Sequence, residues 1–349
     1  MLIIILVILG LSLLILGHEA GHFFVAKYLK LKVDEFGFGF PPRIFAKKIG
    51  ETEYSLNWLL FGGFVKIAGE NDRMSGGLDK LQELPAEEKQ KLFVFRSAWQ
   101  RALVTVAGVV VNFFIGWVLI SFVLVVGTPR ALVVSNVEKD SPAAVAGIRT
   151  GDVIKNYYEA QKFIRYIDVN RGNTVQLEIR RGKDNFAFTV VPRKTTSPNQ
   201  GAIGVFLAEA GEEKQPFFSA LFGGLKRALM LSGWTLVAFY ELIKNLILHG
   251  SLLAGVVGPV GIFSVAQETG QLGLIYLVQL VSLISLNLAV INLIPFPALD
   301  GGRLLLIAIE KVKGSPISLK AEAWVNGIGF LFLIFLMVVI TIRDVARWF

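Results

Sequence analysis

Residues 2–26 read LIIILVILGLSLLILGHEAGHFFVA, an apolar run long enough to cross a membrane as one helix. His18, Glu19 and His22 lie near its end. Side chains four positions apart lie on one face of an α-helix, so His18 and His22 can bind one metal ion. Glu19 is one position further round the helix, where it can act on a water molecule instead of binding the metal. The stretch therefore predicts a metal site inside an apolar helix.

The surroundings of this motif make it more specific than its short pattern. Each ionisable side chain inside a membrane helix costs at least about 2.5 kcal/mol, so three of them indicate a functional site. The alternative is a soluble core helix with two hydrogen-bonded histidines, but no amphipathic pattern surrounds the motif. At about 1.5 Å per residue, His18 lies about 24 Å along the helix from Leu2. That depth is near the far face of a hydrocarbon layer about 30 Å thick.

The composition indicates a membrane protein. Of the 349 residues, 54% are hydrophobic, and the mean hydropathy is +0.60, which is high for a soluble chain of this length. The chain has no cysteine, which excludes disulfides and thiolate metal sites. Its net charge of +8 fits contact with an anionic membrane surface, and the sequence has no basic patch typical of nucleic-acid binding. The three histidines are His18, His22 and His249, so a third metal ligand must be His249 or a carboxylate.

Hydropathy predicts a multi-pass α-helical membrane protein with four transmembrane helices, over residues 2–26, 102–127, 272–294 and 323–342. Basic residues that follow the first helix, among them Lys27 and Lys30, place that side in the cytoplasm. Asn112 is the polar exception in the second helix, where it either bonds to another helix or faces the metal site.

The region between the first two helices contains strand-like sequence. Residues 53–58 and 62–67 predict a β-hairpin on the cytoplasmic side, whereas the glycines and prolines of residues 36–42 exclude a helix there. The hairpin either dips toward the membrane or lies in the cytoplasm. Residues 78–101 predict a charged surface helix.

Residues 128–211 change character and predict an inserted α+β domain. Strand-like runs occur at residues 132–137, 174–179 and 186–191. From Asp140 to Ile154 the sequence DSPAAVAGIRTGDVI predicts a short capped helix that stops at Gly147 and turns into a strand. This pattern resembles the signature of a bacterial PDZ domain. Because it follows an outward crossing, we expect it outside the cytoplasm, where it either captures a peptide by strand addition or acts as a steric cap.

Asp300 is the expected third metal ligand. It directly follows the span 272–294, and Gly301 permits close approach of the backbone to another element; a helix N-cap is the alternative role. Asp300 reaches the same membrane face as His18 and His22 only if residues 217–248 do not cross, so we expect an interfacial helix there. His249 then lies across the bilayer. The predicted division is residues 1–127, the first transmembrane pair with the hairpin; 128–211, the PDZ-like domain; 212–271, the interfacial helix and an outer loop; and 272–349, the second transmembrane pair.

The order of these motifs resembles the site-2 protease family. The resemblance rests on His18-Glu19-x-x-His22, on the PDZ-like segment and on Asn292-x-x-Pro295-x-x-x-Leu299-Asp300-Gly301. The stretches 61–66 and 258–262 are similar to family patterns as well. The chain looks most like the bacterial zinc proteases of regulated intramembrane proteolysis that process anti-sigma factors. The best known of these has two PDZ domains, whereas this chain has room for one.

The resemblance implies a zinc-dependent intramembrane endopeptidase in the bacterial inner (cytoplasmic) membrane, with its site near the cytoplasmic face. It implies Zn²⁺ on His18, His22 and Asp300, Glu19 as the catalytic base, and substrate contacts from Asn292, Phe64 and Val65. The expected partners are the lipid bilayer and single-span membrane proteins trimmed beforehand by another protease, such as anti-sigma factors, or signal-peptide remnants. The alternatives are an inactive membrane scaffold, a metal or proton transporter with a PDZ-like regulatory domain, and a membrane-anchored protease that cuts soluble proteins.

Overall fold

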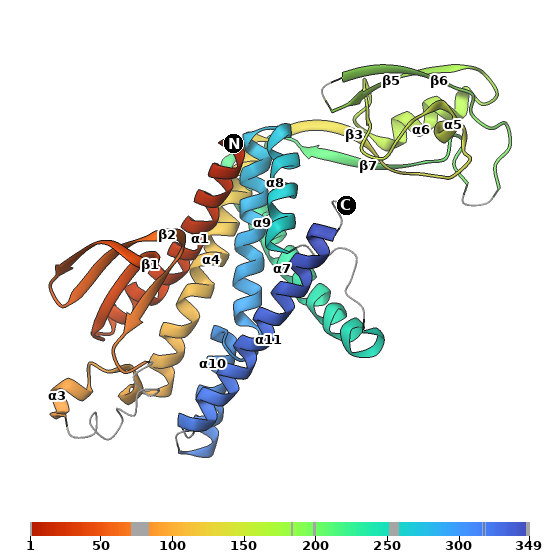
Figure 1. The fold of residues 1–349 in the computed structure, drawn as a ribbon. Helices are drawn as coiled ribbons and strands as arrows, with labels where there is room; N and C mark the ends of the chain where they lie inside the picture. The colour runs from red at the N-terminus through yellow and green to blue at the C-terminus, as the bar shows by residue number, and fades with distance from the viewer. Residues whose placement is uncertain are drawn as a thin grey trace. The chain divides into compact units, whose positions relative to one another are not determined.

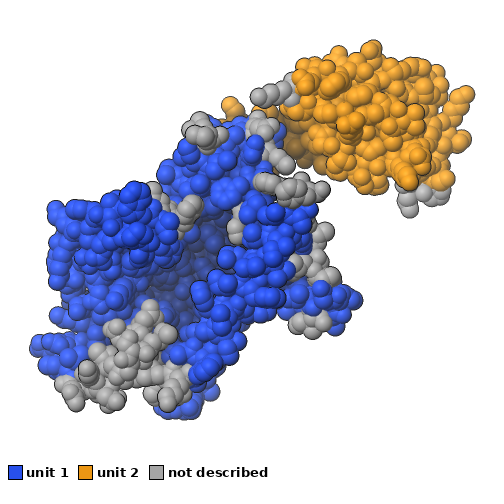
Figure 2. All heavy atoms as spheres, viewed as in Figure 1, with its two compact units in different colours: residues 1–122, 221–349 blue, residues 123–220 orange. Residues whose placement is uncertain are grey.

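The computed structural model describes residues 2–70, 84–182, 184–197, 200–250, 258–315, 317 and 319–346. The chain forms two compact units, which Figure 2 distinguishes by colour. The first unit comprises residues 1–122 and 221–349, and the second comprises residues 123–220. The expected PDZ-like segment falls within the second unit, while the predicted domain boundaries remain a prediction.

Four helices in the described residues are long and apolar enough to cross a membrane, which confirms the expected multi-pass class. They are α1 (Leu2–Tyr28), α4 (Ala98–Val126), α9 (Leu274–Leu293) and α11 (Leu319–Ala346). In Figure 1, α1, α4 and α9 run alongside one another. The α1 and α4 backbones meet at Gly21, where an added Cβ would lie 2.6 Å from the Ala107 carbonyl oxygen. A residue without a side chain is therefore needed for this approach.

The hairpin between α1 and α4 is longer than expected. It consists of β1 (Val33–Ile49) and β2 (Thr52–Ile67), which pair antiparallel. Both predicted strands belong to β2, and the expected turn between them is confirmed, because residues 53–56 run parallel to residues 35–38 whereas residues 63–66 run antiparallel to them. The two segments lie on opposite sides of residues 35–38, and a second turn lies at Gly50, with φ +64°. Residues 36–42 are not helical, as expected, but belong to β1, where register shifts accommodate the prolines and glycines. The strand β2 packs against α1.

The predicted helix over residues 78–101 is wrong for residues 84–97, whereas residues 98–101 are helical as the start of α4. Residues 84–97 contain two short helices, α3 (Ala86–Lys89) and η2 (Phe93–Phe95), and residues 78–83 lie outside the described residues. The Phe93 amide donates to the Ala68 carbonyl at 2.9 Å, and the Lys91 carbonyl accepts from the Lys32 amide at 2.9 Å. These bonds to the β1–β2 region, together with the burial of Phe93, replace a continuous helical ladder.

Three further helices complete the first unit. They are α7 (Phe217–His249), whose first residues belong to the second unit, α8 (Pro259–Leu272) and α10 (Asp300–Lys313). Most of the expected outer loop is helical, because residues 259–272 form α8, and its position outside the cytoplasm stays a prediction. The first turn of α8 is capped by Asp344, whose Oδ2 accepts from the Gly258 amide at 2.8 Å. The helix α7 is not among the four apolar spans found in the described residues. It contacts α9, because its Thr235 hydroxyl donates to the Asn287 side-chain oxygen at 2.7 Å. Its interfacial position stays a prediction.

The second unit is built on a five-stranded antiparallel sheet with strand order β6-β5-β4-β3-β7. Its elements are β3 (Thr128–Val137), α5 (Pro142–Ala146), β4 (Val153–Ile154), α6 (Ala160–Val169), β5 (Val175–Arg181), β6 (Asp184–Val190) and β7 (Val205–Glu212). The three predicted strand runs are confirmed. So is the capped helix: the Ser141 hydroxyl accepts from the Ala144 amide at 3.1 Å, and Gly147 ends α5 with φ +93°. The sheet and α6 enclose an apolar core around Leu132 and Phe163.

Candidate metal centre

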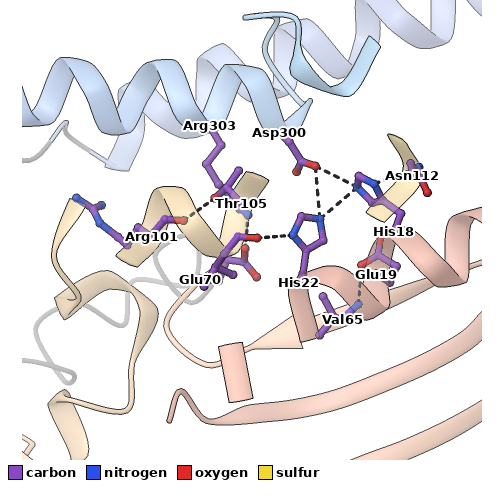
Figure 3. A network of polar contacts seen from close by, with 11 residues as sticks. His18, Glu19, His22, Val65, Glu70, Arg101, Thr105, Asn112, Asp300 and Arg303 are labelled. Atoms are coloured by element: carbon purple, nitrogen blue, oxygen red, sulfur yellow. Dashed lines mark hydrogen bonds and ion pairs between the residues drawn. The ribbon is translucent and has the colours of Figure 1, made fainter. Parts of the chain in front are cut away.

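Two histidines of α1 and one aspartate of α10 meet at a single point. His18 Nε2 lies 3.0 Å from Asp300 Oδ2 and 3.2 Å from His22 Nε2, and His22 Nε2 lies 3.4 Å from the same Asp300 oxygen. Figure 3 shows the three side chains pointing toward one another. Both histidines are buried, and Asp300 is the first residue of α10 instead of its N-cap, which is Leu299. The structure thus joins residues from opposite ends of the chain.

The spacing of these three atoms fits a tetrahedral metal ion. Zinc bonds of about 2.0–2.2 Å place tetrahedral ligand atoms about 3.3–3.6 Å apart, close to the separations of 3.0–3.4 Å here. Asp300 Oδ2 is buried and accepts no hydrogen bond from the described residues, although it faces two ring nitrogens. A cation between the three atoms would satisfy all of them. Two imidazoles and a carboxylate are a donor set that zinc accepts in catalytic sites.

His22 is held in the orientation that a ligand needs. Its Nδ1 lies 2.8 Å from the Val104 carbonyl oxygen of α4. Because a carbonyl only accepts, Nδ1 carries the proton and Nε2 presents its lone pair to His18 and Asp300. Such an acceptor behind a metal-binding histidine fixes the ring and its tautomer.

Gly108 makes room for both imidazoles and was not predicted from the sequence. A Cβ at this position would lie 2.5 Å from His22 Nε2 and 2.7 Å from His18 Cε1, so any side chain would displace the rings. The one signal in the sequence is a glycine inside an apolar span, and the span contains a second one, Gly116. Asn112, one turn further along α4, lies with its Nδ2 atom 3.4 Å from His18 Nδ1.

Glu19 is adjacent to the three-residue cluster but is not part of it. Its Oε2 accepts a hydrogen bond from the Val65 amide of β2 at 3.1 Å. The hairpin therefore holds this carboxylate, and Val65, predicted to contact substrate, lies beside it through its main chain. The arrangement places a proton acceptor near a metal-binding cluster, which is the pair that metal-assisted hydrolysis requires.

The remaining predicted residues are not members of the three-residue cluster. The Phe64 ring stacks near Phe40, with centroids 6.5 Å apart. Asn292 is half-buried in the last turn of α9. His249 is exposed at the end of α7 and is not one of the three clustered residues, so the structure does not bring the competing ligand to this site. The roles of these residues stay predictions.

The fold and the site define a membrane protein with a buried cluster suited to a metal ion. Residues 6–336 match the model of peptidase family M50. Because this match covers nearly the whole chain, the protein belongs to peptidase family M50.

Curated relatives align along their full length with this chain. A Clostridium perfringens protein assigned as a zinc metalloprotease is 33% identical, covering 98% of both chains. The chain is also similar to the regulator of sigma-W protease RasP of Bacillus subtilis, at 26% identity over 96% of both chains, and to the zinc metalloprotease RasP of Geobacillus kaustophilus, at 27% over 96% of both. The alignment with the first RasP runs over 412 positions, more than the 349 residues of this chain, so that relative is longer.

Proposed function

We propose that this protein is an intramembrane endopeptidase that uses His18, His22 and Asp300 as zinc ligands and Glu19 as the catalytic base. It is a zinc metalloprotease with Zn²⁺ as its cofactor, in agreement with its family and with the names of its relatives. The observation that carries the proposal is the convergence of three ligand atoms within 3.0–3.4 Å of one another. Two of these atoms belong to the apolar helix α1, on which the carboxylate of Glu19 directly follows His18.

The chain's own groups supply the proton transfers. Zinc, when bound, polarises the scissile carbonyl and acidifies a water molecule. Glu19 accepts a proton from the attacking water and passes it to the nitrogen of the leaving amine. The Val65 amide donates a hydrogen bond to Oε2 of Glu19 and so fixes the carboxylate. The other oxygen of Glu19, Oε1, serves as the proton acceptor. The Val104 carbonyl keeps the proton of His22 on the side away from the centre.

The proposed substrate is a transmembrane helix of a single-span membrane protein. A helix hides its carbonyl groups in internal hydrogen bonds, so the scissile segment must unwind before cleavage. In the β1–β2 sheet of the described residues, residues 35–38 and 53–56 pair on both sides, whereas residues 63–66 pair on one side, so the edge at 63–66 can receive an unwound segment by strand addition. Phe64, Val65 and Asn292 are the proposed substrate contacts. The bond from Val65 to Glu19 supports the hairpin's proximity to the chemistry.

We propose that the second unit is a single PDZ-like domain that filters substrates. Its β7 is an edge strand, and a cavity of about 390 Å³ lies between α6 and residues 200–207. An edge strand beside a helix can bind a peptide or block an untrimmed one. We place this unit outside the cytoplasm and the metal centre near the cytoplasmic face of a bacterial inner membrane. Because a relative is named regulator of sigma-W protease, we propose membrane-anchored regulators, already trimmed by another protease, as substrates.

The test separates metal binding from catalysis. Purified protein, with and without a zinc chelator, is incubated with a panel of single-span membrane peptides, and cut positions are read by mass spectrometry. We expect cuts within the apolar segments, which the chelator abolishes. The Glu19→Gln variant should keep its zinc and lose cleavage by about two to four orders of magnitude, the usual size of a general-base contribution. Undiminished cleavage by this variant would refute the role of Glu19, and cuts confined to soluble regions would refute the intramembrane assignment.

A further inference from the structure

We propose that Asn112 is a positioning residue of the metal centre. Its side-chain oxygen accepts the Nδ1–H of His18, so that His18 Nε2 presents its lone pair to Asp300 and His22. This inference rests on the proposed zinc site. It assigns Asn112, the polar residue that the sequence analysis singled out in the second span, a role at the metal site and not in a general contact between helices.

The first observation is the position of the Asn112 side chain. Asn112 is 1% exposed, and its amide group faces His18 Nδ1 at 3.4 Å. The other end of the amide, Oδ1, is buried and has no hydrogen-bond partner among the described residues. A buried acceptor without a donor costs about 1–3 kcal/mol, so this end of the side chain is in an unfavourable environment.

The second observation concerns which imidazole nitrogen carries the proton. With the amide NH₂ group facing Nδ1, Nδ1 must accept, and the proton lies on Nε2, where it would prevent metal binding. The oxygen and nitrogen of an asparagine amide differ little in size and are assigned from their hydrogen bonds. Rotating the amide by half a turn lets Oδ1 accept from Nδ1–H, which satisfies the buried oxygen and frees the lone pair of Nε2. A bound cation and this amide orientation therefore favour each other.

The third observation is that α4 supplies a polar partner to each of the two histidines. His22 bonds to the main-chain carbonyl of Val104, which no substitution can remove. His18 lies one turn earlier on α1 and meets a side chain instead. The buried Ser285 hydroxyl of α9 donates to the main-chain carbonyl of Asn112 at 2.7 Å, so α9 also contacts α4 at this residue.

The experiment measures zinc affinity of the purified full chain by competition with a chelator of known affinity. Asn112→Leu removes the acceptor and keeps the number and branching of the side-chain heavy atoms, and we expect its zinc dissociation constant to rise about 10–100-fold, as for other partners of metal-binding histidines. Asn112→Asp keeps an acceptor oxygen and should stay near the wild-type value. Asn287→Leu is the matched control, because Asn287 lies in another span and bonds to Thr235, not to the metal centre.

A second readout reports on the centre itself. The visible absorption of Co²⁺ bound in place of zinc depends on ligand geometry, so Asn112→Leu should change this spectrum and Asn287→Leu should leave it unchanged. If Asn112→Leu does not fold, Asn112→Ala, which only removes atoms, gives the same comparison.

Each result decides the question. Wild-type affinity and an unchanged Co²⁺ spectrum in Asn112→Leu would overturn the inference. Equal weakening by Asn112→Leu and Asn287→Leu, or by Asn112→Leu and Asn112→Asp, would overturn it too, because the acceptor would then not be the cause. Failure of the wild-type protein to bind zinc would instead overturn the proposed function, so the two failures can be told apart.

Discussion

At the scale of single residues, the metal centre depends on the missing side chain of Gly108. We expect Gly108→Ala to lower zinc affinity about tenfold or more, because a methyl group 2.5 Å from His22 Nε2 must push the ring aside. Zinc content after dialysis against a weak chelator measures the effect. Gly233→Ala is the control, because a Cβ there meets no atom within 4 Å. Equal zinc retention by Gly108→Ala and the wild type would show that the rings tolerate the methyl group.

Asp152 of the second unit gives a prediction about pH. Burial alone would raise its pKa, but the hydrogen bonds from the Arg181 guanidinium and the Arg149 amide outweigh burial and hold the pKa below its ordinary value. Because the folded-state pKa is lowered, the stabilisation is present above the unfolded value of about 3.9 and is lost as the pH falls through the folded value. We expect Asp152→Asn to lower the free energy of unfolding of this unit by about 1–3 kcal/mol at neutral pH.

The difference between the two proteins should shrink below about pH 4, as Asp152 becomes protonated in the wild type. Hydrogen exchange of the β4 and β5 amides in the full chain, corrected for the intrinsic exchange rate, measures it. A difference that does not change between neutral and acidic pH would show that the ionised carboxylate is not what stabilises the unit.

At the scale of elements, α10 carries Asp300 and is joined to the first half of the chain by two ion pairs. Arg101 of α4 lies 2.7 Å from Glu310, both nearly buried, and Arg303 pairs with Glu70 beyond β2. Removing one partner of a buried pair leaves an uncompensated charge, so Glu310→Met should destabilise the protein by about 3–5 kcal/mol. The double variant Arg101→Met with Glu310→Met should recover most of that loss. Thermal unfolding in detergent tests this, and additive losses would contradict the pairing.

The sequence predicts elements whose signal is local. The apolar run of α1 and its His18-Glu19-x-x-His22 motif lie within one helix, and Ser141 and Gly147 cap α5 from its own ends. The pairing of the predicted strands was missed because residues 53–56 and 63–66 pair with opposite sides of residues 35–38, which the sequence did not identify as a strand. The helix over residues 78–101 was overpredicted because the bonds of Lys91 and Phe93 go to residues about 25–60 positions away.

In the metal site too, the parts with a local sequence signal were predicted, and two contacts between residues far apart in the chain were not. Asp300 was predicted as a ligand from its place directly after the span 272–294 and before Gly301, and the structure brings it to both histidines. Gly108 and the contact of Asn112 with His18 join residues about 90 positions apart. Nothing in the chain near either residue indicates which helix it will face.

At the scale of the whole molecule, one bound metal ion joins two distant segments of the first unit. The α1 helix supplies two ligands and α10 supplies the third, so a bound metal links the two ends of that unit. Peptidase family M50 covers the same span, from residue 6 to residue 336. The second unit, residues 123–220, contributes no residue to this cluster and has its own sheet, core and cavity.

The most direct test is X-ray absorption at the zinc edge on the purified full chain and on Asp300→Ala. We predict one zinc ion per chain, surrounded by nitrogen and oxygen atoms at about 2.0–2.2 Å, and a spectrum that contains scattering from two imidazole rings. In Asp300→Ala the zinc content should fall, and any residual zinc should keep the imidazoles and lose one oxygen ligand. An unchanged spectrum and zinc content in Asp300→Ala, or zinc without imidazole ligands in the wild type, would contradict it.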